Sequence, residues 1–153
     1  MINNLKIKEN LYLQCVDFVE KRFQTIQNTI NGIQESLTSE TKSSAGDKHE
    51  TGRAMLQLER EKAGNQLSEI QKIKEQLSKI TLSKSSGFIG IGSVVYTTNT
   101  NYYISISAGE LKVNQTMFFA ISPITPIAQL LLSKTKNDMI TFRDLEFKIL
   151  NVI

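Results

Sequence analysis

A heptad repeat of apolar residues near the start of the chain restricts its fold more than any other feature. Between residues 5 and 37, apolar side chains recur at alternating spacings of four and three residues, at Tyr12, Val16, Val19, Phe23, Ile26, Ile30, Ile33 and Leu37. This spacing lines the side chains up on one side of a helix and is typical of a coiled coil. Neither Gly nor Pro occurs between Met1 and Asn31. The pattern therefore predicts one long helix over residues 5–37.

A second, looser helical pattern follows a polar break. Ser, Thr and Gly are concentrated between Thr38 and Gly46, which favours a turn. From Asp47 to about Leu82, apolar residues again return at helical spacings, at Leu56, Ala63, Leu67, Ile70, Ile73, Leu77 and Ile80. Because a short connection joins two helices of matching length, we expect residues 1–82 to form an antiparallel coiled-coil hairpin. One long dimeric coiled coil is the alternative, which the polar break disfavours.

The apolar period changes to two beyond a Ser- and Gly-rich stretch at residues 83–92, which we interpret as a linker. Strands are predicted at residues 93–98, 102–108, 117–121, 139–142 and 145–153. In the second of them, Ile104 and Ile106 alternate with serines, as expected for a strand that buries one face.

A short helix interrupts these strands. Thr125 is a suitable N-cap and Pro126 a suitable first helical residue, so the helix is predicted to start there. Residues 93–153 should then form a small antiparallel β domain with one short helix. Together with the N-terminal helices, this gives an α+β fold class.

Composition and charge narrow the possible function classes. No apolar run approaches the ~18 residues of a membrane span, and the polar N-terminus lacks an apolar signal core. The single cysteine, Cys15, excludes an intramolecular disulfide, so we expect a cytoplasmic protein in a reducing compartment, without membrane contact. The net charge of +3 is spread without a basic run, which disfavours direct nucleic-acid binding. No Cys/His metal cluster, Gly-rich phosphate loop or catalytic triad is apparent.

Two carboxylates three residues apart, Asp47 and Glu50, stand where the second helix begins. Residues at this spacing lie on one face of a helix, so the two side chains can share a hard cation such as Mg²⁺. The same pair is also a helix-start motif, with Asp47 as N-cap and Glu50 three positions later. The two interpretations are compatible, because a capping carboxylate keeps a free oxygen.

The order of hairpin, acidic tip, linker and small β domain resembles the Gre family of bacterial transcript-cleavage factors (GreA/GreB). The stretch Gly46-Asp47-Lys48-His49-Glu50 looks like the tip of that family, in which Gly-Asp-x-x-Glu opens the second helix. Residues 121–128, Ile-Ser-Pro-Ile-Thr-Pro-Ile-Ala, are similar to its C-terminal signature. Residues 147–152 look like its closing strand. The resemblance covers essentially the whole chain.

The resemblance implies a transcription elongation factor that is not itself an enzyme. The β domain would be FKBP-like and would dock on RNA polymerase through Ser122, Pro123, Thr125, Pro126 and Ile127. The hairpin would enter the secondary channel, where Asp47 and Glu50 act as catalytic acids. They would hold a Mg²⁺ jointly with the polymerase, which then cleaves the 3′ end of a backtracked transcript. We expect a monomer that meets the nascent RNA only indirectly.

The residues after the tip depart from the family pattern. Where the family usually continues Asn-Ala-Glu-Tyr, this chain has Thr51-Gly52-Arg53-Ala54, so a carboxylate is replaced by Arg53 and the aromatic is missing. Lys48, His49 and Arg53 also dilute the negative charge of the tip. Two alternatives therefore stay open. One is a secondary-channel regulator of transcription without cleavage activity, and the other is a structural coiled-coil adaptor.

Overall fold

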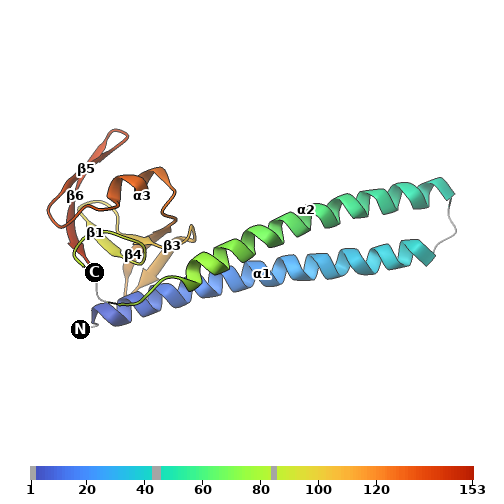
Figure 1. The fold of residues 1–153 in the computed structure, drawn as a ribbon, viewed down its shortest axis with the longest axis horizontal. Coiled ribbons are helices and arrows are strands. Elements are labelled where there is room, and N and C mark those ends of the chain that lie inside the picture. The colour runs from blue at the N-terminus through green and yellow to red at the C-terminus, as the bar shows by residue number, and fades with distance from the viewer. Residues whose placement is uncertain (1–2, 43–45, 84–85) are drawn as a thin grey trace. The chain divides into compact units, whose positions relative to one another are not determined.

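The structure, a computed structural model, describes residues 3–42, 46–83 and 86–153, with only the backbone of residues 40–42 and 46–49. These residues form an α+β fold, as predicted (Figure 1). The elements are α1 (Asn4–Lys42), α2 (Gly46–Ser78), β1 (Val94–Thr97), β2 (Tyr102–Ile104), β3 (Gly109–Val113), β4 (Thr116–Ile121), α3 (Pro126–Leu131), β5 (Met139–Phe142) and β6 (Leu145–Val152).

The chain divides into two compact units. The helical unit comprises Val19–Lys74, and the sheet unit comprises Met1–Phe18 together with Glu75–Ile153. None of the helices in the described ranges is both long enough and apolar enough to cross a membrane.

Both long helices end at different residues from those that the sequence pattern predicts. α1 continues through Thr38 to Lys42, where we expected a turn. The Thr38 hydroxyl donates to the Gln34 carbonyl one turn earlier at 3.0 Å, so this polar side chain is satisfied within the helix. α2 ends at Ser78 and not near Leu82. After it, the Ile80 amide bonds back three residues to the Leu77 carbonyl, a tightened last turn.

The two helices of the helical unit run antiparallel. Glu20 of α1 pairs with Lys74 of α2 at 2.8 Å, whereas Leu37, later in α1, accepts a hydrogen bond from Arg53, earlier in α2. Between these contacts lies a buried apolar cluster of Ile30, Ile33, Leu37 and Ala63. Isolated helices are marginal in water, so burial of this stripe supplies most of the stability of the pair.

The sheet is mixed, and the predicted purely antiparallel sheet is wrong. Its strand order is β3-β4-β2-β1-β6-β5, and β2 and β4 pair in parallel. The cause is β3, which was not predicted. The chain leaves β2, forms β3 at the edge, turns at Asn114 and Gln115 in left-handed conformations, and returns as β4 between β3 and β2. Because β3 reverses the chain direction once and β4 reverses it again, β4 runs parallel to β2.

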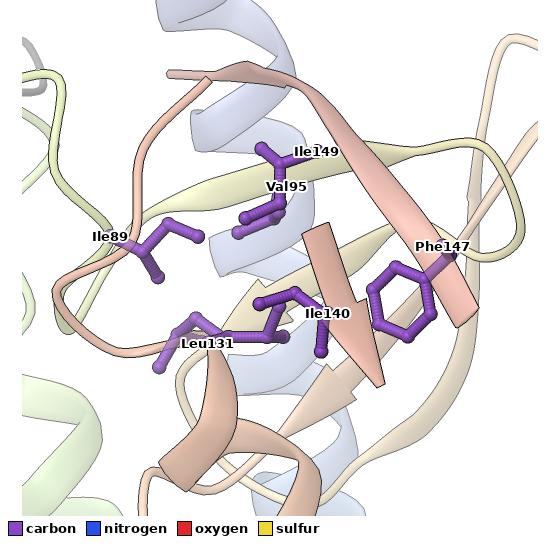
Figure 2. Packing of buried hydrophobic residues seen from close by; sticks show 7 residues of the cluster. Ile89, Val95, Leu131, Ile140, Phe147 and Ile149 are labelled. Atoms are coloured by element: carbon purple, nitrogen blue, oxygen red, sulfur yellow. The ribbon is translucent and has the colours of Figure 1, made fainter. Parts of the chain in front are cut away.

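β2 ends at Ile104, so it is shorter than the predicted strand 102–108. Tyr103 and Ile104 bury its two faces, although the alternation of serines predicted one exposed face. Ile104 belongs to the main core, in which side chains from β1, β2, β5, β6, α3 and the segment before β1 meet (Figure 2). On the other face, the Ser105 hydroxyl lies 3.6 Å from the Cys15 thiol of α1. Cys15 and Leu11 are fully buried there, and burial raises the pKa of the Cys15 thiol. The start of α1 is therefore a layer of the sheet unit.

The second half of the predicted linker packs into the sheet unit. Ile89 is buried in the core and exchanges backbone hydrogen bonds with Ser133 and Lys134, both 2.8 Å long. Gly92 has φ +91°, and a Cβ at this position would lie 3.2 Å from the Thr81 carbonyl. Only glycine fits this close approach without a backbone shift.

Tyr103 of β2 is fully buried, and its hydroxyl has no hydrogen-bond partner among the described residues. We expect Tyr103→Phe to raise the free energy of unfolding by about 1 kcal/mol at neutral pH, because an unsatisfied polar group is removed. Burial, and then the nearby Cys15 and Tyr12, raise the pKa of Tyr103 above its usual 10.0. Above pH 10 the unfolded chain therefore loses this proton first, which destabilises the native protein but not the variant. Urea unfolding from pH 7 to 11 should show a gap that widens above pH 10; a less stable variant would contradict the expectation.

Candidate functional site

The two predicted tip acids both lie in the first turns of α2. α2 begins at Gly46, so Asp47 is its second residue and not the N-cap that the sequence suggested. The side chains of Asp47, Lys48 and His49 lie outside the described residues. Glu50 follows three residues later, and its side chain is exposed. How the two carboxylates lie relative to each other therefore stays a prediction, whereas the Glu50 carboxylate is free to meet a cation or a partner.

The Arg53 side chain is directed toward α1. Its guanidinium donates to the Leu37 carbonyl at 3.3 Å, and Arg53 is partly buried. The reason is its place on the helix: Arg53 precedes Leu56 by three residues, so both lie on the face of α2 that packs on α1. The sequence suggested Arg53 only as a positive charge that dilutes the acidic tip, and could not reveal this contact.

In the part of the chain that the structure describes, no three His, Cys, Asp or Glu side chains come together to hold a metal ion. Mg²⁺ keeps several of its waters and is usually held by one or two carboxylates together with further ligands from a substrate or partner. Glu50 alone can therefore contribute to a shared Mg²⁺ site but cannot build one.

The predicted docking loop lies between β4 and α3 and is fixed by hydrogen bonds. The Thr125 hydroxyl accepts from the Ala128 amide at 3.4 Å and donates to the Ser122 carbonyl at 2.8 Å. Thr125 has the extended backbone of an N-cap, and Pro126 is the first residue of α3. The predicted cap and helix start are therefore confirmed.

Further contacts tie this loop to its surroundings. The Gln129 side chain donates to the Pro123 carbonyl at 2.6 Å, and the Ser122 amide donates to the Ser107 hydroxyl at 3.3 Å. Ile127 packs against the core cluster and is only partly exposed. Ser122 and Thr125 thus shape the loop, and Ile127 anchors it.

Ile124, which was not among the predicted docking residues, is the most exposed large apolar side chain of the loop, with 83% of its surface accessible. Its exposure leaves this apolar side chain available for contact with a partner. The signal in the sequence was its position between Pro123 and Pro126, since such a segment cannot continue a helix or a central strand.

No protein-family model matches the sequence, and no curated protein matches it. The functional interpretation therefore depends on the residues of the tip and the loop, and on the motifs that these residues form.

Proposed function

We propose that this chain is a Gre-like transcription elongation factor, which binds RNA polymerase and stimulates Mg²⁺-dependent cleavage of backtracked transcripts through its secondary channel. One observation carries the proposal: the exposed carboxylate of Glu50 lies in the first turns of a helix that a second helix accompanies antiparallel. At 1.5 Å per residue, the 33 residues of α2 reach about 50 Å. A pair of long antiparallel helices with an acid in the first turns of one of them suits delivery of that acid into a narrow channel.

The chemistry needs only carboxylates from this chain. Hydrolysis of a phosphodiester by two metal ions requires a second Mg²⁺ that activates water and stabilises the developing charge. In the proposal, Asp47 and Glu50 bind this ion together with ligands of the polymerase, so the reaction belongs to the polymerase. Coiled-coil packing of α1 on α2 and an FKBP-like arrangement of the sheet and α3 are parts of the same proposal.

The loop around Ile124 would provide the docking contact. Its backbone is already fixed by Thr125 and Gln129, so binding would cost little conformational entropy. An exposed apolar residue on such a loop can enter a pocket of the partner and exclude water there, as anchor residues of protein interfaces do.

Ile124→Asp tests this contact in the full-length protein. We expect polymerase binding to weaken about fivefold, which corresponds to loss of roughly 1 kcal/mol of interface energy. The melting temperature should not change, because the side chain is exposed. Ile91→Asp is the matched control, since Ile91 is also exposed, at 62%, in the same unit but outside the loop. Equal effects of the two substitutions on the dissociation constant would contradict a specific contact.

Transcript cleavage tests the proposal as a whole. Purified full-length protein and Mg²⁺ are added to a stalled, backtracked elongation complex with a labelled transcript. We expect release of short 3′ fragments and a shortened transcript that can be extended again. Binding without cleavage would favour the regulator alternative, and absence of binding would favour the structural adaptor.

A further inference from the structure

Among the side chains that the structure describes, the apolar packing of the helical unit ends at Leu37 and Leu56. Toward the tip, the last apolar residues of the buried cluster are Leu37 on α1 and Leu56, packed against it, on α2. One turn closer to the tip on the same face of α2 stands Arg53, whose guanidinium reaches across to the Leu37 carbonyl at 3.3 Å. A hydrogen bond thus takes the place of the next apolar contact.

We propose that Arg53 is a positioning residue: it clasps α2 to α1 at the end of the apolar packing and thereby fixes where the Glu50 carboxylate is held. Glu50 precedes Arg53 by three residues and Leu56 by six, so it lies about 60° around the helix axis from Arg53 and about 120° from Leu56, and its side chain is exposed. Any fraying of α2 that releases Arg53 also displaces Glu50. The role of Glu50 rests on the proposed function, whereas the clasp does not.

The chemistry of the contact suits this role. A guanidinium donates through a planar fork, and its hydrogen bond to a carbonyl is strengthened by its charge. The acceptor lies near the C-terminal end of α1, where the helix dipole is negative and favours a cation. The contact is partly buried, so water and salt weaken it less than a surface pair.

Arg60 provides an internal comparison. It lies two turns further along the same face of α2 and is also partly exposed, and its guanidinium folds over Gly64. In the described ranges it makes no hydrogen bond or ion pair. Replacing Arg60 therefore removes the same charge from the same helix without removing a clasp.

The first test measures amide hydrogen exchange in the full-length protein, without polymerase. We expect Arg53→Gln to speed exchange of the amides in residues 51–56 about tenfold, the factor for loss of one charge-assisted hydrogen bond. Arg60→Gln should leave these amides unchanged, and Arg53→Lys should restore part of the protection. If the amides of residues 51–56 exchange equally fast in Arg53→Gln and Arg60→Gln, Arg53 does not hold α2 to α1.

The second test measures cleavage with the same variants at equal polymerase occupancy. We expect Arg53→Gln to lower the cleavage rate severalfold, Arg60→Gln to leave it unchanged and Arg53→Lys to recover it in step with the exchange protection. Faster exchange with unchanged cleavage would overturn the positioning role. If the native protein stimulates no cleavage, the proposed function fails, and the exchange result still decides the clasp by itself.

Discussion

Ile30→Asp should unfold the helical unit. Ile30 is only 7% exposed and packs with Ile33, Leu37 and Ala63 at the centre of the contact between α1 and α2. A carboxylate at this position would be buried without a partner, at a cost of about 3–5 kcal/mol. Since neither helix is stable in isolation, separation of the pair should also melt much of both helices. The helical signal in far-ultraviolet circular dichroism should therefore fall.

The matched control is the neighbouring residue. Asn31→Asp adds the same charge one position along α1, where the side chain is exposed, and should change stability by less than about 0.5 kcal/mol. Urea unfolding of both variants separates burial of the charge from the charge itself. If Ile30→Asp keeps the native helix signal and unfolding midpoint, Ile30 does not hold the two helices together.

The two long helices could be predicted because their packing on each other requires a regular spacing of apolar residues. Every third or fourth residue of α1 must be apolar to meet α2, and residues such as Ile30 and Ile33 reveal this spacing directly. The helix ends were not predictable in the same way. Thr38 has weak helix propensity, but its hydroxyl bonds to the backbone one turn earlier, and the helix continues through it.

The sheet was harder to predict from the sequence, because its pairing and burial depend on residues that are distant in the sequence. The alternation over residues 102–108 suggested one exposed face, yet Ser105, just after β2, is covered by α1 some ninety positions earlier. Parallel pairing of β2 with β4 depends on β3, a short edge strand in which Leu111 and Val113 alternate with Glu110 and Lys112. This alternation is a local strand signal, but it does not reveal which strands β4 pairs with. No local pattern contains these relations.

In the candidate site too, local features could be predicted from the sequence and long-range contacts could not. The Thr125 cap and the Pro126 helix start are local, and both were readable from the sequence. Exposure of Ile124 depends on how Gln129 and Ser107 hold the loop, and the direction of Arg53 depends on a carbonyl sixteen residues away. Long-range contacts therefore decide which residues of a motif shape a site and which are free to bind.

Removing the charge of the tip acids should abolish most of the proposed activity without unfolding the protein. Glu50→Gln keeps the size of an exposed side chain, and Asp47→Asn keeps the size of the side chain at the second position of α2. Both variants should therefore fold and bind polymerase. A neutral amide is a far weaker ligand for Mg²⁺ than a carboxylate, so each variant should stimulate transcript cleavage by the polymerase at least about tenfold less, equivalent to roughly 1.4 kcal/mol of barrier.

Two controls separate loss of the metal ligand from other effects. Glu61→Gln removes an exposed carboxylate from the same helix, three turns further from the tip, and should leave the cleavage rate unchanged. Raising the Mg²⁺ concentration should partly restore the cleavage that Glu50→Gln and Asp47→Asn stimulate, because a weakened Mg²⁺ site is refilled by mass action. If the polymerase cleaves the transcript at the native rate with both tip variants, these acids contribute only to the start of α2 and not to cleavage. If the rate falls but Mg²⁺ does not restore it, the carboxylates act on the polymerase or the transcript directly, and not through a shared ion.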